Sequence, residues 1–241
     1  MSHVCLNAIV KNESARIERM LASVAPHIAS YVIGDTGSTD GTQALIRDFM
    51  GACGVPGVLY EAPFTNFRDS RNLALEQARR VRGELGWEYL LLVDADMELV
   101  APSGLGRLTA SGYQLLQRSG SLEYWNARLV RWDNENRYAC VTHEYLSTAH
   151  PLVKLPGPWF QDYADGANRP GKVERDIALL SAEVDRDPND GRSWFYLGNS
   201  YREIGRHKEA IEAYMRRVEV GGWNEEIYCS LLYAARCARA M

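Results

Sequence analysis

The feature that most constrains the fold of this chain is an alternation of strand-like and helix-like segments through the first hundred residues. Short apolar runs predict strands over 3–10, 31–33, 58–60 and 89–93. Between them, helical spacing of apolar residues predicts helices over 17–28, from Asp40 onward and over 66–81. Strands that alternate with helices pair in parallel through right-handed crossovers, so the sequence predicts an α/β layered domain.

The pattern changes after Asp96. Segments 112–117 and 122–132 have mixed polarity and are predicted as longer strands, added antiparallel at one edge of the sheet. Segment 156–171 holds three prolines and three glycines, which predicts a boundary and a mobile loop. From Lys172 onward the pattern is helical only. We therefore expect an α/β domain over 1–170 and an all-α segment over 171–241.

The helical segment carries a repeat signature. Trp194, Leu197, Gly198 and Tyr201 match the W-x2-L-G-x2-Y pattern of a tetratricopeptide repeat, which has a period of about 34 residues. The residues at the next positions of the pattern are Gly205, Ala210 and Tyr214. A lone repeat cannot bury its own apolar face, so we expect it to dock on the first domain, to pair with another chain, or to continue in a longer protein.

Composition excludes several classes of protein. The chain has 27 Lys and Arg against 31 Asp and Glu, a balance that argues against nucleic-acid binding. Its apolar runs are too short to span a bilayer, and its first residues show no secretion signal. Five widely spaced cysteines without a CxxC motif are typical of reduced thiols, so a cytoplasmic location is expected.

The strongest chemical motif is Asp94-Ala95-Asp96, directly after the apolar strand 89–93. Carboxylates two residues apart project from one face of an extended segment, and open α/β sheets bind ligands at the carboxyl ends of their strands. Carboxylates there suit a hard divalent ion that also holds phosphate oxygens. A second Asp-x-Asp, at Asp185 and Asp187, follows an amphipathic helix and is interpreted as a solvated helix end.

Three further clusters could serve a ligand. The turn 35–41 (Asp-Thr-Gly-Ser-Thr-Asp-Gly) follows another strand; Asp35 is its better ligand candidate, whereas Asp40 is expected to cap the next helix. Arg68, Arg71 and Asn72 share one helix face, which suits a diphosphate but is also typical of a solvated face.

His143-Glu144 could provide a metal ligand and a general base, although a histidine on such a strand is more often structural. The chain lacks a P-loop, GxGxxG after its first strand, HExxH and GxSxG, which argues against nucleotide triphosphatases, dehydrogenases, zinc proteases and lipases.

Together these motifs resemble family 2 glycosyltransferases of the GT-A fold, in the branch that carries C-terminal tetratricopeptide repeats. The resemblance rests on residues 9–13, 35–41, 71–75, 94–96 and 143–146, and it continues through 172–176 into the repeat. It implies a hexosyltransferase that uses a nucleotide-activated sugar, expected to be a UDP-sugar, with Mn²⁺ or Mg²⁺, and that inverts the anomeric centre.

The same resemblance implies roles for single residues. Donor-binding residues would be Val10, Asn12, Glu13, Asp35, Ser38, Arg68, Arg71, Asn72, Asp94 and Lys172. Asp94, Asp96 and His143 would be metal ligands, and Glu144 and Asp96 would act in catalysis, with Glu144 as the base. Arg169 and Lys172 would close over the diphosphate as a lid.

One departure from the family concerns the third metal ligand. Many relatives carry a histidine just before the Lys/Arg-Asp run, but residues 161–166 contain none; Asp162, Asp165 or His143 could replace it. A peptide or protein acceptor on the repeat is expected. The alternatives are a catalytically silent GT-A domain that serves as an interaction module and a nucleotidyltransferase, for which the chain lacks a basic Gly-rich loop after the first strand. The sequence leaves open the donor sugar, the acceptor, a homo-oligomer and truncation of a longer chain.

Overall fold

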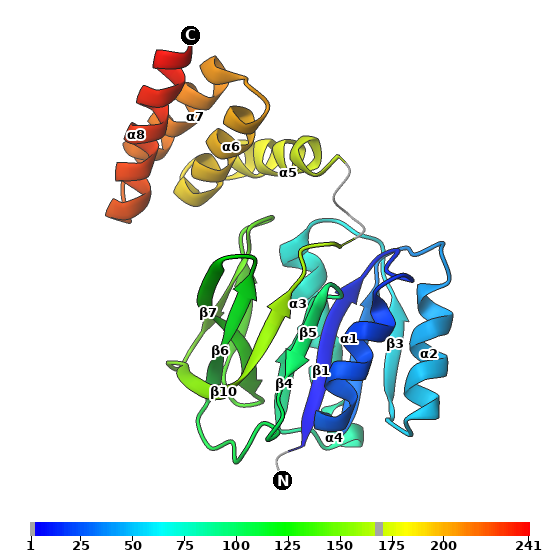
Figure 1. The fold of residues 1–241 in the computed structure, drawn as a ribbon. Coiled ribbons are helices and arrows are strands. Elements are labelled where there is room, and N and C mark those ends of the chain that lie inside the picture. Colours follow the sequence, from blue (N-terminus) through cyan, green and yellow to red (C-terminus); the bar gives the residue numbers. More distant parts are fainter. Residues whose placement is uncertain (1–2, 167–170) are drawn as a thin grey trace. The chain divides into compact units, whose positions relative to one another are not determined.

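The structure is a computed structural model that describes residues 3–166 and 171–241. The chain divides into two compact units (Figure 1). The first comprises Met1–Thr65, Asp69–Tyr138 and Leu146–Arg169, and the second comprises Asn66–Arg68, Ala139–Tyr145 and Pro170–Met241. This division differs from the predicted boundary, because 66–68 and 139–145 group with the helices rather than with the sheet.

The first unit is built on an eight-stranded sheet with the order β3-β2-β1-β4-β7-β6-β10-β5. Its strands are β1 (Val4–Val10), β2 (Ser30–Asp35), β3 (Gly57–Glu61), β4 (Tyr89–Leu92), β5 (Met97–Val100), β6 (Gly112–Ser119), β7 (Leu122–Arg131) and β10 (Val153–Asp162). Two short strands, β8 (Asn136–Ala139) and β9 (Tyr145–Thr148), form a separate sheet. The predicted mixed α/β architecture is confirmed.

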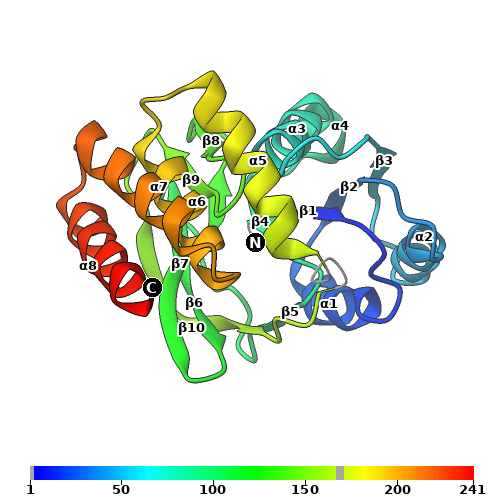
Figure 2. The same ribbon diagram turned by 90° about the horizontal axis from the view of Figure 1, so that it is seen from above.

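Helices cover both faces of the parallel half of this sheet. They are α1 (Ile17–Val24), followed by a 3₁₀ turn (Ala25–His27), α2 (Thr42–Ala52), α3 (Phe67–Arg80) and α4 (Arg82–Leu85). Figures 1 and 2 show α1 and α2 on one face and α3 and α4 on the other. The side chains of β1 alternate accordingly: Leu6 packs in the core that holds α1, and Cys5 packs in the core that holds α3.

The antiparallel strands extend the sheet beyond β4, but not as its edge. β7 pairs antiparallel with β4, and β6 pairs antiparallel with β7, as the mixed polarity predicts. β10 then pairs parallel with β6, and β5 forms the outer edge. The predicted antiparallel addition at the β4 edge of the parallel strands is therefore observed, but β10 and β5 lie beyond β6, so 112–132 is not the outer edge of the whole sheet.

The predicted loop over 156–171 is wrong over its first half, which belongs to β10. Pro156 and Pro158 have no N–H to donate, yet the strand tolerates them because its register against β6 shifts between Lys154 and Trp159. Gly157 lies between them with a φ of 108°, a conformation that favours glycine. An irregularity in the ladder therefore accommodates the residues that suggested a loop.

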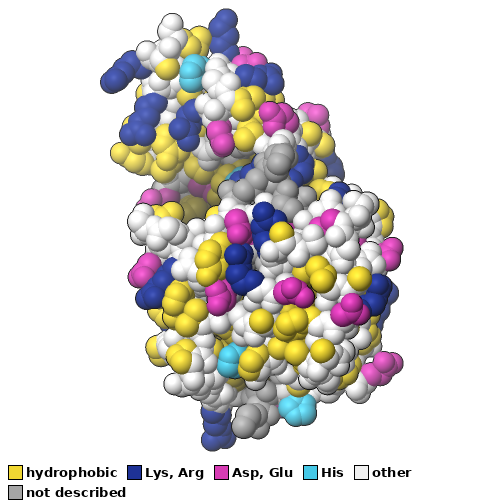
Figure 3. Space-filling view, turned by 45° about the vertical axis from the view of Figure 1, so that its right-hand side comes forward, with side chains coloured by type: hydrophobic (Ala, Val, Ile, Leu, Met, Phe, Trp, Pro, Cys, Tyr) yellow, Lys and Arg dark blue, Asp and Glu magenta, His cyan; other side chains and the backbone are white. Residues whose placement is uncertain are grey.

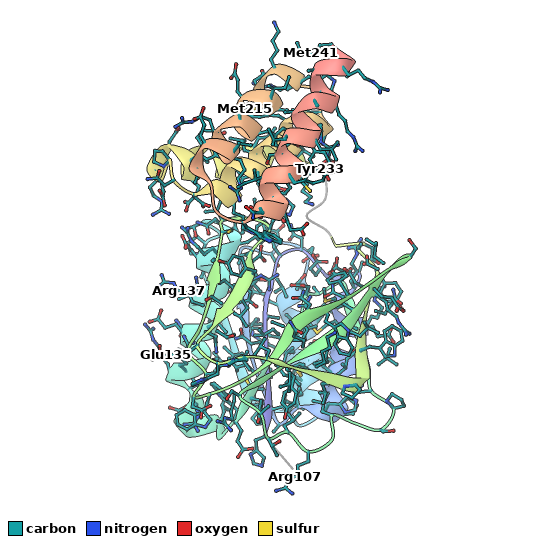
Figure 4. The ribbon with its side chains drawn as sticks, turned by 90° about the vertical axis from the view of Figure 1, so that its left-hand side faces the viewer. Arg107, Glu135, Arg137, Met215, Tyr233 and Met241 are labelled. Atoms are coloured by element: carbon teal, nitrogen blue, oxygen red, sulfur yellow. The ribbon has the colours of Figure 1, made fainter. Side chains whose placement is uncertain are left out.

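The second unit contains four helices in its described part: α5 (Lys172–Arg186), α6 (Gly191–Glu203), α7 (His207–Val220) and α8 (Asn224–Ala240). The helical pattern predicted from Lys172 onward is confirmed. A Cβ atom at Gly198 of α6 would lie 2.6 Å from the Cδ1 and Cε1 atoms of Tyr214 of α7. The close contact of these two helices therefore requires glycine. Figure 4 labels Met215 on α7 and Tyr233 on α8.

The cysteines of the chain are free thiols, as the sequence predicts. All five cysteines are free; Cys5, Cys140 and Cys237 are buried, and burial raises the pKa of Cys5 to about 12. Among the described helices, none is long and apolar enough to cross a membrane. On the face seen in Figure 3, Lys and Arg side chains are interspersed with Asp and Glu.

Candidate active site

The carboxyl ends of β1, β2 and β4 bring the predicted donor-binding segments to one edge of the sheet. β1 pairs parallel with both β2 and β4, and Val10 lies opposite Asp35 at the end of the ladder. Asp94 and Asp96 follow two and four residues after the last residue of β4, Leu92. The first unit therefore gathers Val10, Asp35 and the Asp94-Ala95-Asp96 motif at this edge.

Asp35 is fully buried, and hydrogen bonds reach only one of its two carboxylate oxygens. Its Oδ1 atom accepts hydrogen bonds from the backbone N–H groups of Gly37, at 2.9 Å, and Ser38, at 2.8 Å. Its Oδ2 atom is buried and has no hydrogen-bond partner within the described residues. A buried acceptor without a donor is costly, so this atom is a good place for a donor group of a ligand.

Two loops at this edge are joined by reciprocal hydrogen bonds. The N–H of Asn12 donates to Ser38 Oγ at 2.8 Å, and the N–H of Thr39 donates to Asn12 Oδ1 at 2.8 Å. The N–H of Glu13 donates to Thr42 Oγ1 at 2.8 Å. The side chains of Asn12 and Ser38, predicted to contact the donor, thus hold the loops that flank Asp35.

The predicted capping role of Asp40 is also observed, one residue earlier than a standard N-cap. Helix α2 begins at Thr42, and Gly41 precedes it with a φ of 90°. Asp40 Oδ1 accepts from the N–H of Thr42 at 3.1 Å, and Oδ2 accepts from the N–H of Ser14 at 3.0 Å. Gln43 does not complete a capping box; its side chain accepts a hydrogen bond from Arg47.

Asp94 is held by two arginines. Its Oδ1 atom lies 2.5 Å from Nη2 of Arg71, and its Oδ2 atom lies 3.3 Å from Nη1 of Arg128. Burial alone would raise the pKa of this carboxyl, but the two guanidinium groups outweigh burial and keep the pKa of Asp94 well below its usual range. Asp94 is therefore a fixed carboxylate whose charge is already balanced.

Asp96 has the opposite environment. Burial, together with the negative charges of Asp94 and Asp162, raises its pKa above the ordinary value. Its Oδ2 atom accepts from the N–H of Gly166 at 3.2 Å. The carboxylate of Asp96 thus sits where negative charge is unfavourable, and a cation would relieve that cost.

The two aspartates among the three candidates for the third metal ligand have different partners. Asp165 forms a salt bridge with Arg19, at 2.9 Å, and a longer one with Arg16, at 3.5 Å. Asp162 accepts from Gln117 Nε2 at 3.0 Å, and its charge acts on Asp96. Asp162 is therefore the candidate that belongs with Asp96.

The residue types at Asp96 fit a divalent ion of the predicted kind. Among the residues that the structure describes, no three His, Cys, Asp or Glu side chains form a group that could hold a metal ion. Mg²⁺ and Mn²⁺ sites in phosphate-transferring proteins use one or two carboxylates and complete their shell with phosphate oxygens and water. Asp96, with the charge of Asp162 acting on it, fits such a site as one of its one or two carboxylate ligands.

The three residues predicted on one face of α3 have separate partners. Arg71 pairs with Asp94, whereas Arg68 belongs to the second unit and pairs with Glu183 at 2.7 Å. The side chain of Asn72 forms two hydrogen bonds with the backbone of Tyr138. It donates to the carbonyl at 3.0 Å and accepts from the N–H at 2.8 Å. That the three residues bind one diphosphate together stays a prediction.

Asn72 also lines a groove of about 790 Å³ in the first unit, to which none of the other predicted donor-binding residues contributes. The groove runs along α3 and past the exposed Trp132 to the β8 and β9 strands. Glu135 and Arg137 lie at its rim and point outward (Figure 4).

His143, Glu144 and Lys172 belong to the second unit. The ring of His143 stacks on Tyr196, with centroids 4.1 Å apart, and burial lowers its pKa. Lys172 is the first residue of α5 and is exposed. Arg169 lies outside the described residues. That these groups act at the Asp94–Asp96 edge stays a prediction.

Sequence reasoning missed Arg128 and Gln117. Arg128 on β7 is 6% exposed and donates to Gln117 Oε1 at 2.7 Å and to the carbonyl of Leu92 at 3.2 Å. Gln117 in turn donates to Tyr124 Oη and Asp162. The sequence signal that could have identified Arg128 is its charge between the apolar residues Ala127 and Leu129 of a predicted strand.

Comparison with known proteins places the fold among solved structures. No protein-family model matches the chain. A TPR repeat-containing protein of Synechococcus elongatus is 26% identical over 256 residues, covering 97% of this chain and 60% of that protein. TarS of S. aureus has a TM-score of 0.53 at 12% identity, covering 93% of this chain and 50% of TarS.

A mannosyltransferase from Pyrobaculum calidifontis, solved in complex with GDP-Man and Mn²⁺, has a TM-score of 0.45 at 15% identity, over 99% of this chain and 80% of its own. The likeness to TarS shows a shared fold. The chain spans 60% of the length of the curated relative and 50% of that of TarS.

Proposed function

We propose that the chain is a metal-dependent glycosyltransferase that moves a sugar, with inversion, from a nucleotide diphosphate donor to an acceptor. The observation that carries this proposal is the unequal environment of Asp94 and Asp96. Arg71 and Arg128 balance the charge of Asp94, whereas Asp96 has a raised pKa beside two other carboxylates. A pair of adjacent carboxylates with such different environments is typical of a functional site.

The roles of the two carboxylates follow from their partners. Asp96, with Asp162 nearby, would hold Mn²⁺ or Mg²⁺, which when bound would stabilise the negative charge of the departing diphosphate. Asp94 would act as a rigid element that fixes Arg71 at the same edge. The contacts around Asp94 therefore favour Asp96 as the main metal ligand and give Asp94 a positioning role.

The buried Oδ2 atom of Asp35 supports a nucleotide with an imino N–H, because such a donor would satisfy this acceptor. Uracil carries an N–H of this kind, so a UDP-sugar is the preferred donor. Val10 lies opposite Asp35 in the ladder and would provide apolar contact with the base.

In the transfer step, Glu144 would accept the proton of the acceptor hydroxyl while the acceptor oxygen forms its bond to the anomeric carbon. The bond between that carbon and the diphosphate oxygen breaks, and its electron pair leaves with the diphosphate. Direct attack from the opposite side inverts the anomeric centre. Arg71 and Lys172 would stabilise the charge of the leaving group.

The α5–α8 helices would form a tetratricopeptide-repeat-like segment that docks a peptide or protein acceptor. The contact between Gly198 and Tyr214 supports this proposal, because the repeat pattern pairs a small residue with an aromatic ring at these positions. The name of the Synechococcus relative agrees with it.

The test is hydrolysis of nucleotide sugars by the purified chain with and without Mn²⁺, measured as release of the nucleotide diphosphate. We expect UDP release from a UDP-sugar with Mn²⁺, and its loss in Asp96→Asn. Asp185→Asn is the matched control, because it removes an exposed carboxylate from the second Asp-x-Asp of the same chain. Equal activity in both variants would contradict the proposal, and no activity with any donor would favour a silent interaction module.

A further inference from the structure

The segment that carries His143 and Glu144 is built into the helical unit. Its residue Val141 is 3% exposed and packs in one apolar cluster with Leu180, Val184 and Leu197. The carbonyl of Val141 accepts from the N–H of Phe67 at 3.0 Å, and Phe67 belongs to the same unit. The Thr142-His143-Glu144 stretch therefore takes its position from α5 and α6.

Residues of α5 and α6 contact both the ring of His143 and the side chain of its neighbour Thr142. Its imidazole stacks on the ring of Tyr196 from α6, with centroids 4.1 Å apart and planes inclined by 10°. The Nε2 atom lies 3.9 Å from Oδ2 of Asp176, on α5. Asp176 is 3% exposed, and its Oδ1 atom accepts from the hydroxyl of Thr142 at 3.2 Å.

The backbone of His143 is held as well. His143 has a φ of 51°, which a non-glycine residue adopts only where its surroundings fix it. Arg192 of α6 donates to the carbonyl of His143 at 3.4 Å and to Tyr196 Oη at 3.2 Å. Glu226 of α8 fixes Arg192 in turn, at 2.9 Å. Contacts from α5 and α6 thus converge on His143, and α8 supports one of them through Arg192.

We propose that Tyr196, Asp176 and Arg192 are positioning residues for the His143–Glu144 segment, so that the helical unit sets the geometry of catalysis in addition to docking a partner. This inference rests on the proposed function, in which Glu144 accepts the acceptor proton. Glu144 follows His143 directly in the chain. A movement of His143 therefore also moves the backbone of Glu144, and with it the carboxylate that accepts the proton. Tyr196 does not contact the donor in this scheme, and its loss acts on kcat.

The experiment measures kcat and KM for donor hydrolysis in Tyr196→Leu and Tyr196→Phe, with Tyr233→Leu on α8 as control. Misplacement of a reacting group by about 1 Å costs about 100-fold, so we expect Tyr196→Leu to lower kcat by about 10- to 100-fold at unchanged KM. Tyr196→Phe keeps the stacked ring and restores kcat. Tyr233→Leu removes ring contacts with Phe195 and Tyr214 in the same unit and leaves kcat unchanged.

A spectroscopic readout reports the contact itself. In the wild-type chain the ring current of Tyr196 shifts the His143 ring protons upfield, and these resonances move downfield in Tyr196→Leu but stay in place in Tyr233→Leu. If Tyr196→Leu does not fold, Asp176→Asn replaces it, because it keeps the size of the side chain and an acceptor for Thr142 but removes the charge beside His143.

The outcomes separate the two proposals. This inference alone is overturned if the wild type is active and kcat is unchanged in Tyr196→Leu. The same holds for Asp176→Asn where that variant replaces Tyr196→Leu. A wild-type chain without activity toward any nucleotide sugar overturns the proposed function and this inference with it. A fall in kcat with restoration by Tyr196→Phe supports both.

Discussion

Replacement of Arg128 tests the balance of charge around Asp94. Arg128→Leu removes one of the two guanidinium groups that face Asp94 and leaves Gln117 Oε1 without its 2.7 Å donor. Loss of one partner of a buried ion pair costs about 3–5 kcal/mol. Because Arg71 remains and the Asp94 side chain is 26% exposed, we expect the lower end of that range, about 3 kcal/mol.

The assay is differential scanning calorimetry of the wild type and the variant at neutral pH. For a unit of this size, about 3 kcal/mol corresponds to a fall in Tm of about 6–12 °C. The matched control is Arg118→Leu on the neighbouring strand β6. Its side chain is 40% exposed and pairs with Glu123, so its loss should cost less than about 1 kcal/mol.

The double variant Arg128→Leu/Asp94→Asn isolates the interaction between the two groups. Removal of the charge of Asp94 should recover part of the loss, which gives a coupling free energy of about 1–3 kcal/mol. A fall in Tm no larger than that of Arg118→Leu, or additive effects of the two substitutions, would refute the idea that Arg128 balances the charge of Asp94.

Three further predictions concern other parts of the molecule. The folded-state pKa of Asp94 is lowered, so its contribution to the free energy of unfolding is present above about pH 4 and is lost as the pH falls. In an acid titration, the free energy of unfolding of Asp94→Asn should therefore fall less steeply with pH than that of the wild type. Equal slopes would count against this. Gly198→Ala places a Cβ 2.6 Å from Tyr214 and should cost about 1–3 kcal/mol by urea unfolding, whereas Gly51→Ala in open space should be neutral or stabilising. Asp35→Asn keeps an acceptor oxygen for the N–H groups of Gly37 and Ser38 but can turn its N–H₂ group toward the base. The affinity for UDP, measured by calorimetry, should therefore fall by about 10- to 100-fold. Unchanged affinity would show that Asp35 does not bind the nucleotide.

The local features of the fold could be predicted from the sequence. Strands β1, β2 and β4 are apolar runs of a few residues, and their order along the chain with intervening helices is enough to predict a parallel sheet. That sheet in turn brings Asp35 and Asp94 to one edge. The prediction succeeded here because it depends on short-range patterns and on one topological rule.

Features that depend on long-range pairing were missed. β10 contains Pro156 and Pro158, and only the shift of its register against β6 makes it a strand. Arg128 reaches Asp94 because β7 pairs with β4, a partner distant in sequence. The stacking of Tyr196 on His143 was not predicted, since nothing in the local sequence connects these two residues. Each of these contacts is a property of the folded arrangement.

The central claim, that Asp96 holds the cation, is tested most directly by crystals soaked with UDP and Mn²⁺ and measured at the manganese absorption edge. We predict an anomalous difference peak at the Asp96 carboxylate, next to the diphosphate, and its absence in crystals of Asp96→Asn. A peak elsewhere in the first unit, or no peak with UDP clearly bound beside Asp35, would contradict the assignment.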